Sequence, residues 1–329
     1  MNLKSYFNKG TRELFLLFFS FMIMQFINIQ DSHAAVVDAH YRITSVKKVS
    51  LRTKAINYKS KTAMWTYPYR SNKLAKKTHW LKNYAKRSLM VTKSATLKNG
   101  LKYDFVQVAN KPSVYGWVYA KNLQQMTMVS LGDSITKGWT GSSYATSPYP
   151  QLVSQQLYVL DTNLGQNNGK VVGDTNLDLT SNVTTTNFKK VDIATIAYGV
   201  NDYFHSSLTD VTQVLDDQIK GIKRQNPTIQ LFGILPLNCY VTAFGTDQQS
   251  DAYSTVGYHD YTLSQLCDAE AEVYEDNGVK YLDWRSVDPD IVPTTIDTSI
   301  FGDGKLHPTQ ATYNQVGTDI ANFLEKNLK

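Results

Sequence analysis

The sequence predicts an α/β fold for its C-terminal part and a small all-β domain in front of it. Three observations predict this organisation: apolar runs alternate with helical stretches after residue 126, short aromatic and β-branched runs fill residues 36–125, and the charge changes sign between the two parts. The 329 residues are 42% hydrophobic, which is enough for a substantial core. We therefore expect two domains, residues 36–125 and 126–329.

The N-terminal segment has the pattern of a secretory signal peptide. Basic residues precede an apolar run from Leu14 to Met24, and the small residues Ser32 and Ala34 occupy typical cleavage positions. This predicts a signal peptide over residues 1–34. Polar residues interrupt the apolar character after residue 24, so an uncleaved membrane anchor is the less favoured alternative. No second apolar segment is long enough to span a membrane, and we expect no transmembrane span after cleavage.

The net charge of +6 hides two parts of opposite charge. Residues 36–125 carry 19 Lys and Arg against two acids, whereas residues 126–329 carry 12 basic against 24 acidic residues. A strongly basic domain of an exported protein predicts a polyanion as partner. Outside the cell nucleic acid is not the obvious polyanion, and we expect none. The alternative is that the basic surface only aids export and solubility.

The periodicity of each part predicts its elements. In residues 36–125 the runs AMWTYPY, SLMVT, YDFVQV and YGWVYAKNL predict a small antiparallel, barrel-like domain. After residue 126 the runs MTMVSLG, VDIATIAYG, TIQLFGILP and VKYLDW predict strands, separated by helical stretches such as residues 208–225 and 261–276. This alternation predicts a parallel sheet covered by helices on both faces, with a last helix at about residues 309–327.

Polar residues stand where a ligand of such a sheet would bind. Ser134 and Asn201 follow predicted strands, and His307 lies just ahead of the last helix. A serine needs a neutral imidazole to take its proton, and the imidazole needs a third group to hold its tautomer. We therefore predict Ser134 as nucleophile, His307 as general base and Asp303, in the turn upstream, as the orienting acid. Each residue taken alone is more simply explained as part of a turn or loop.

An oxyanion site is the remaining requirement, because loss of one of its donors typically costs about 10² to 10³ in rate. Asn201 offers a side-chain amide at a strand end. A backbone N–H after the nucleophile and another from the glycine turn NLGQNNGKVVG could complete the site.

These residues resemble the SGNH, or GDSL-type, serine esterases and lipases. GDSIT is similar to the family's first block with Ser134 as nucleophile, GVND to its third with Asn201 as oxyanion donor, and HPT with the upstream Asp303 to its last. The resemblance spans about residues 126–329. It implies a flavodoxin-like three-layer α/β/α sandwich, hydrolysis through an acyl-enzyme, and oxyanion donors from the Ser134 N–H, a second-block glycine and Asn201.

Two blocks depart from the family pattern. The orienting acid usually lies three residues before the histidine, whereas Asp303 lies four before His307, so a backbone carbonyl is the alternative orienting group. The second-block glycine usually comes five residues after an asparagine, whereas Gly169 comes six after. We take Gly169 as the second backbone donor, with Gly165 and Asn168 as the alternatives.

The stretches SVYGWVYAKNL and AMWTYPY are similar to the GW-type, SH3-like modules of bacterial surface proteins. The similarity covers one module, about residues 41–124. It implies that residues 36–125 hold the protein on an anionic cell-wall polymer, teichoic acid or peptidoglycan, of a bacterium of the Gram-positive type.

Metal and redox chemistry have little support in the sequence. No cluster of His, Cys or acidic residues has zinc spacing and no calcium loop is complete, so we expect no metal and no cofactor. Cys239 and Cys267 allow one disulfide or two buried free thiols, and both alternatives stay open.

The sequence therefore predicts a secreted or wall-associated bacterial serine esterase, a carboxylic-ester hydrolase acting on short-chain or O-acetyl esters. One alternative is a surface-binding or adhesin protein with a catalytically degenerate hydrolase domain, which the irregular last block favours. Another is an acyltransferase that passes the acyl group to a wall glycan, because an acyl-enzyme can react with either acceptor.

Overall fold

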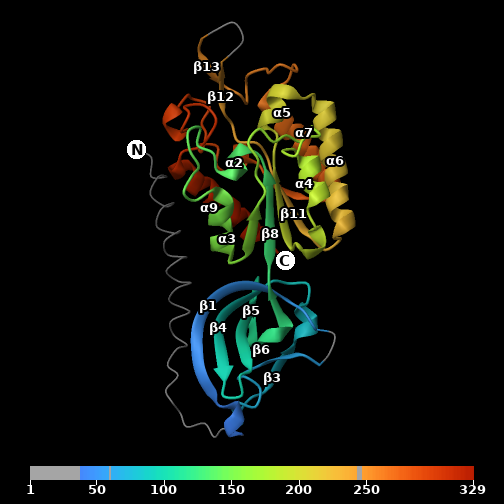
Figure 1. Cartoon of the computed structure of the whole chain (residues 1–329), viewed down its shortest axis with the longest axis vertical. Coiled ribbons are helices and arrows are strands. Elements are labelled where there is room, and N and C mark those ends of the chain that lie inside the picture. The colour runs from blue at the N-terminus through green and yellow to red at the C-terminus, as the bar shows by residue number, and fades with distance from the viewer. Residues whose placement is uncertain (1–37, 59–60, 243–246) are drawn as a thin grey trace, which may run out of the picture.

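The computed structural model describes residues 38–58, 61–242 and 247–329. The predicted signal peptide, residues 1–34, lies outside the described residues. A seven-stranded antiparallel sheet ends at Gln125 and a five-stranded parallel sheet begins at Thr127, so the chain forms two parts along its long axis (Figure 1). We call residues 36–125 the basic module and residues 126–329 the α/β domain. No helix within the described ranges is long and apolar enough to cross a membrane.

The basic module is an antiparallel sheet with the strand order β3-β2-β6-β5-β4-β1-β7. Its strands are β1 (Ile43–Ala55), β2 (Ala63–Trp65), β3 (Lys77–Trp80), β4 (Leu89–Leu97), β5 (Lys102–Val108), β6 (Lys111–Tyr119) and β7 (Leu123–Gln125), and its 3-10 turns are η1 (Ala39–Tyr41), η2 (Leu81–Tyr84) and η3 (Ala120–Asn122). A small core that includes Met64, Val106 and Val118 is fully buried. The predicted all-β domain is confirmed.

A close contact between strands explains why the Gly-Trp pair of the basic module has glycine as its first residue. A Cβ on Gly116 would lie 2.9 Å from the Met64 Cβ and 3.1 Å from the Trp65 carbonyl oxygen. Only glycine therefore lets β6 approach β2 this closely. The next residue, Trp117, is then the β6 partner of Trp65 on β2.

The α/β domain has five parallel strands in the order β14-β11-β10-β8-β9. The strands are β8 (Thr127–Gly132), β9 (Leu160–Asn163), β10 (Ile193–Ala197), β11 (Gln230–Ile234) and β14 (Lys280–Leu282), and a hairpin is formed by β12 (Tyr240–Thr242) and β13 (Gln249–Asp251). The helices are α2 (Ser134–Lys137), α3 (Tyr149–Leu157), α4 (Leu179–Thr185), α5 (Val200–His205), α6 (Leu208–Gln225), α7 (Leu263–Asp276), α8 (Trp284–Val287) and α9 (Gln310–Asn327), with 3-10 turns η4 (Phe188–Lys190) and η5 (Thr298–Ile300).

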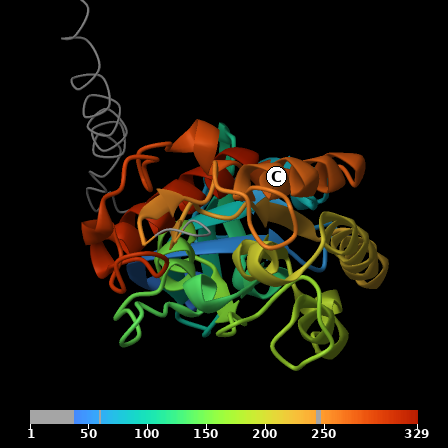
Figure 2. The same ribbon diagram turned by 90° about the horizontal axis from the view of Figure 1, so that it is seen from above.

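The helices cover both faces of the parallel sheet. Helix α3 packs against α9 on one face, and α6 packs against both α4 and α7 on the other (Figures 1 and 2). Counted within this domain, the strand order is 2-1-3-4-5, which is the flavodoxin-like order. The predicted three-layer α/β/α sandwich is confirmed. In this order successive strands are added on one side of β8 and then on the other, so the strand order reverses between β8 and β10, and ligands of such sheets bind at this point.

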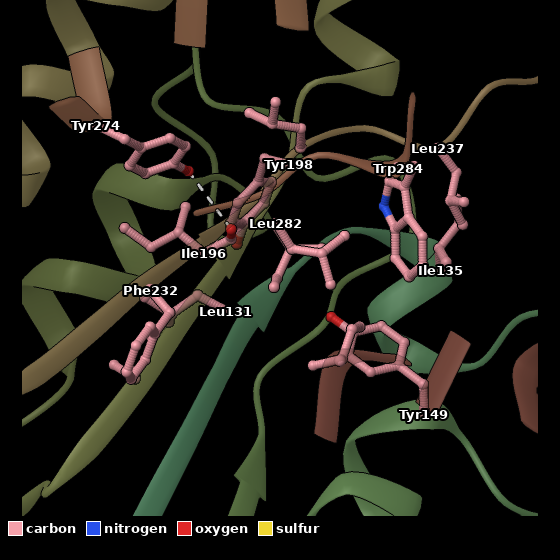
Figure 3. Close-up of a cluster of buried hydrophobic side chains, with 14 of the residues drawn as sticks. Leu131, Ile135, Tyr149, Ile196, Tyr198, Phe232, Leu237, Tyr274, Leu282 and Trp284 are labelled. Carbon is pink, nitrogen blue, oxygen red and sulfur yellow. Dashed lines mark hydrogen bonds between the residues drawn. The ribbon is translucent and has the colours of Figure 1, made fainter. Parts of the chain in front are cut away.

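The core beneath the strand ends is built from the inward residues of adjacent strands. Leu131 of β8, Ile196 of β10 and Phe232 of β11 are buried together, and Tyr274 of α7 donates its hydroxyl to the Ile196 carbonyl at 3.4 Å (Figure 3). Cys239 and Cys267 are both buried and both free thiols, so the chain has no disulfide between them.

The two parts meet in a polar seam at the end of the sheet where β8 begins (Figure 1). The buried Arg52 side chain donates to the Leu157 carbonyl at 3.1 Å and pairs with Glu325 of α9. Lys54 pairs with Asp192 at 2.6 Å. These contacts fix the basic module at the amino ends of the parallel strands, opposite to the strand ends that carry the predicted site.

Candidate active site

Two βα turns lie at the point where the strand order of the parallel sheet reverses, one after β8 and one after β10. One turn leads from β8 into α2 at Ser134, and the other leads from β10 into α5, which carries Asn201. A third segment, the turn before α9, brings His307 to the same place. The sheet topology thus brings together residues that lie up to 173 positions apart in the sequence.

Ser134 is the first residue of a short, well-capped helix. Asp133 caps α2 by accepting the Ile135 N–H at 2.8 Å, and Gly138 ends the helix in the left-handed region at φ +93°. A first-turn N–H has no partner within its own helix, so the Ser134 N–H is available to an acceptor. The Ser134 Oγ lies 3.0 Å from the His307 Nε2, as expected for the predicted nucleophile and base.

Asp303 contacts His307 in spite of the extra residue between them. Its Oδ2 lies 2.6 Å from the His307 Nδ1. Its Oδ1 accepts the backbone N–H groups of Lys305, Leu306 and His307 at 3.1, 2.9 and 3.0 Å. Gly304 adopts φ +73°, and this left-handed residue turns the chain so that both carboxylate oxygens face the turn.

The charge of Asp303 is favoured by the same contacts. Burial raises its pKa, but the hydrogen bonds from the Leu306 and His307 N–H groups and from the His307 ring outweigh burial and leave the pKa below its usual range. The carboxylate therefore stays ionised at neutral pH, and it can hold the proton of the imidazole on Nδ1.

Asn201 and Gly169 meet, although in a different way from the one expected. The Asn201 Nδ2 donates to the Gly169 carbonyl at 3.0 Å, which leaves its second N–H for another acceptor. The Gly169 N–H already donates to Gln166, and the Gly165 N–H already donates to the Asn163 side chain. Of the three alternatives, the Asn168 N–H is the one for which no hydrogen bond to another described residue is found, and Asn168 has φ +62°.

Two buried carboxylates hold this loop, and sequence reasoning had not assigned them a role. Asp202 accepts the Val171 and Val172 N–H groups at 2.8 and 3.0 Å, and Asp178 accepts the Lys170 N–H at 3.0 Å. Burial raises the pKa of Asp202 to about 6 even though both backbone donors lower it. Backbone amides as partners leave no pattern in the sequence, so no signal could have identified this arrangement.

Buried acidic side chains lie in the interior beneath the site. Burial raises the pKa of Asp133 to about 7 and the pKa of Glu270 well above its usual range. A cavity of about 30 Å³ lies next to Asp133, lined by Thr136, Tyr198 and Trp284 among others. It has room for one or two water molecules. Within the described part of the chain, no three His, Cys or acidic side chains form a group that could hold a metal ion.

Comparison with known proteins identifies the α/β domain. A sequence model of the GDSL-like Lipase/Acylhydrolase family matches residues 130–315, more than half of the chain. The chain belongs to this family. This GDSL-like acylhydrolase is therefore a carboxylic-ester hydrolase, and the resemblance found in the motifs around Ser134, Asn201 and His307 is confirmed at the level of the family.

A second sequence model, that of the GW (Gly-Tryp) dipeptide domain, matches residues 45–124 of the acylhydrolase. This match confirms the resemblance of the basic module and indicates a cell-wall-associated bacterial protein. No curated protein matches the sequence.

Comparison with solved structures finds several that are similar to the acylhydrolase. A protein from Lactobacillus plantarum is 20% identical with a TM-score of 0.50, covering 62% of this chain and 98% of that chain. A lipase/acylhydrolase from Enterococcus faecalis is 19% identical with a TM-score of 0.45, covering 62% and 98%. An acetylxylan esterase from Geobacillus stearothermophilus is 16% identical with a TM-score of 0.45, covering 62% and 95%.

Proposed function

We propose that this acylhydrolase is a wall-associated bacterial serine esterase that cleaves short acyl esters, acetyl esters above all, with Ser134 as nucleophile. The observation that carries the proposal is the unbroken relay from the Ser134 hydroxyl through the His307 ring to the Asp303 carboxylate, with distances of 3.0 and 2.6 Å. A hydroxyl, an imidazole and a carboxylate in this order make a weak nucleophile reactive at neutral pH.

In the first half-reaction the Ser134 Oγ attacks the ester carbonyl carbon while its proton passes to the His307 Nε2. The carbonyl oxygen becomes an oxyanion, which the Ser134 N–H and the second Asn201 Nδ2–H stabilise. The Asn168 N–H is the candidate third donor, because the Gly165 and Gly169 N–H groups are already used within the loop. The intermediate collapses when the His307 Nε2–H gives its proton to the leaving alkoxide. The products are the free alcohol and an acyl ester on Ser134.

In the second half-reaction a water molecule replaces the alcohol. The oxygen of the water attacks the acyl carbon while the His307 Nε2 takes one of the water's protons. His307 then returns a proton to the Ser134 Oγ as the carboxylic acid leaves. A wall glycan hydroxyl that attacked in place of water would make the enzyme an acyltransferase. The chemistry at Ser134 is the same in both cases, so product analysis distinguishes them.

The interior of the domain favours a short acyl group. Ser134 is only 4% exposed, and the cavity next to Asp133 has a volume of about 30 Å³. A cavity of this size admits one or two water molecules, so a long alkyl chain cannot enter it without displacing the core. An acetyl group needs no such space, because its methyl group extends only one carbon beyond the carbonyl.

The catalytic proposal is tested with the purified full chain and its Ser134→Ala variant. Wild type should be labelled by a fluorophosphonate and should hydrolyse p-nitrophenyl acetate faster than the octanoate, whereas the variant should do neither. Release of free acetate in the presence of acceptor glycans indicates a hydrolase, and acetylated glycan indicates a transferase. Equal rates for wild type and Ser134→Ala would contradict the assignment of the nucleophile.

We infer that the basic module holds the enzyme on teichoic acid, a wall polymer of repeated phosphodiesters. Most of its lysines and arginines are exposed. The ion pairs found among its described residues, made by Arg52 and Lys54, both lead to the α/β domain and leave the outer surface positive. Exposed lysine side chains are flexible, so their ammonium groups can follow and attract the phosphates of a flexible polymer.

Four aromatic residues on the basic module, which we call the aromatic strip, lie on adjacent strands: Trp65, Phe105, Tyr115 and Trp117. Phe105 lies between Trp117 and Tyr115, with ring centroids 5.4 and 5.7 Å away, and Trp65 is paired with Trp117 on the neighbouring strand. The Lys93 ammonium group lies 5.7 Å from the centroid of the Phe105 ring. The strip is thus a place where rings and cations face a ligand together.

Sedimentation of full-length Ser134→Ala with isolated walls tests this inference. Adding Lys77→Glu and Lys93→Glu should weaken binding about tenfold, and binding should fall with salt because exposed charges are screened. The control is Lys189→Glu with Lys280→Glu, the same change of charge on exposed lysines of the α/β domain. Undiminished binding to walls stripped of teichoic acid would point to peptidoglycan and contradict the inference.

A further inference from the structure

An exposed aromatic ring stands on the loop that leaves the nucleophile's helix. The side chain of Tyr144 is 50% exposed, and its ring packs edge-on against Trp139 with a centroid distance of 5.1 Å and an interplanar angle of 65°. The two residues also form an isolated antiparallel bridge. The ring is therefore held in one position by its neighbour and its backbone, with one side open to solvent.

The loop of Tyr144 touches the catalytic relay on both sides. The Trp139 N–H donates to the Ser134 carbonyl at 2.9 Å, so the loop starts directly at the nucleophile. Gly141 packs on the orienting acid, because a Cβ added there would lie 2.5 Å from the Asp303 Cβ. Tyr144 thus belongs to a loop that contacts both the backbone of the nucleophile and the orienting acid.

The same ring also contacts the loop of the oxyanion site. Asn167, two residues before Gly169, donates its side-chain N–H to the Tyr144 hydroxyl at 3.2 Å. The Lys137 ammonium group, from the last turn of α2, lies 5.7 Å from the centroid of the ring. Tyr144 therefore forms part of the rim of the site, with the Asn167 amide at its hydroxyl edge and the Lys137 ammonium group over its ring.

We propose that Tyr144, supported by Trp139, is the platform on which a sugar ring stacks when it is the alcohol part of the ester, so that the natural substrates are acylated sugars. A pyranose presents C–H groups on its face and hydroxyl groups around its rim, which matches a half-exposed aromatic ring that has an amide, its own phenol and an ammonium group close by. An alkyl alcohol offers neither the broad C–H face nor the hydroxyl groups that such a rim can bind.

The position of the ring favours the alcohol over the acyl part. The carbonyl carbon must reach the Ser134 Oγ, and Ser134 is almost completely buried, whereas Tyr144 is half exposed. The small acyl group then lies inside, and the sugar, which continues as a polymer in a wall glycan, lies along the open side. This inference rests on the proposed esterase function.

The test compares two acetates that differ only in the alcohol. Methyl 6-O-acetylglucopyranoside and ethyl acetate are both acetates of primary alcohols, and the release of acid from both can be followed at constant pH. For Tyr144→Ala, the preference for the sugar acetate over ethyl acetate should fall about tenfold, mainly through KM, because an aromatic stacking contact is lost. Tyr144→Phe keeps the ring and should keep most of the preference.

The control is Tyr158→Ala, which removes a tyrosine of similar exposure, 42%, from the other end of the domain and should leave both rates unchanged. Equal losses on both acetates in Tyr144→Ala, or no loss on either, would overturn the inference. A wild-type enzyme that hydrolyses ethyl acetate but shows no preference for the sugar would also overturn it while leaving the esterase function intact. A wild type no faster than Ser134→Ala on either acetate would instead contradict the esterase function.

Discussion

Replacing Asp303 by asparagine changes one functional group in the relay and tests what sets the tautomer of His307. In the wild type, one carboxylate oxygen accepts three backbone N–H groups and the other accepts the ring Nδ1–H at 2.6 Å. The oxygen of an asparagine can keep the three backbone bonds, each worth about 1 kcal/mol. The flipped amide would lose these three bonds and keep only one, so the amide NH₂ should face the ring.

An NH₂ group that faces Nδ1 reverses the relay. The Nδ1 must then accept a hydrogen bond, the proton of the neutral ring moves to Nε2, and Nε2 can no longer take the proton of Ser134. We expect kcat to fall about 10⁴-fold, or about 5.5 kcal/mol in activation free energy, as in serine hydrolases of the triad type. KM should change little, because Asp303 does not touch the substrate.

The assay is p-nitrophenyl acetate hydrolysis by the full chain between pH 5 and 9, a range in which the lowered pKa of Asp303 keeps the wild-type carboxylate ionised. The control is Asp297→Asn, at an exposed acid that makes a similar turn contact by accepting the Ser299 N–H at 3.0 Å. Its activity should equal that of wild type. An Asp303→Asn enzyme within tenfold of wild type would refute the reasoning and would favour a backbone carbonyl as the orienting group.

Three further predictions follow from other contacts. Asn201→Ala should lower kcat about 10² to 10³-fold at nearly constant KM in the same assay, and a smaller effect would remove Asn201 from the oxyanion site. Arg52→Ala should lower the free energy of unfolding in urea by about 3 kcal/mol, because the buried Leu157 carbonyl loses its charged donor, whereas Lys47→Ala on the exposed surface should change it by less than about 0.5 kcal/mol. Asp133→Asn should raise the free energy of unfolding by about 2–4 kcal/mol at pH 8 but not at pH 4. The pKa of Asp133, about 7, lies above its value in the unfolded chain, so burial of the charged carboxylate destabilises the wild type as the pH rises from 4 to 8. An equal gain in the free energy of unfolding at both pH values would contradict this cause.

The fold was predictable where hydrophobic periodicity is strong. The helical stretches 208–225 and 309–327 correspond to α6 and α9, and four apolar runs correspond to β8, β10, β11 and β14. Strand β9 was missed, because it is a short edge strand whose residues, Leu160 to Asn163, are mostly polar and exposed. At the edge of a sheet the backbone pairing with β8 replaces the apolar signal on which the prediction depends.

The site was predictable only as far as its motifs reach. Ser134, His307 and Asn201 were proposed from side-chain chemistry and motifs at strand ends and before the last helix, and the structure places Ser134 in contact with His307. The contact of Asp303 was not predictable from the spacing, because it depends on the left-handed conformation of Gly304. The Gly169 N–H was expected to be available and is instead used in a turn, a detail that loop geometry alone decides.

Helix α9 begins three residues after His307 and carries Glu325, the partner of Arg52, in its last turn. Its 18 residues span about 27 Å, so a single helix connects the turn of His307 to the seam. Directly after the helix, the Leu328 carbonyl accepts a hydrogen bond from the Asn110 side chain of the basic module, and the Lys329 carbonyl accepts one from the Ser88 N–H. The basic module therefore cannot be exchanged for another domain without further changes. A domain that replaced it during evolution would have to supply its own cation for Glu325 and its own hydrogen-bond donors for the last two residues of the chain.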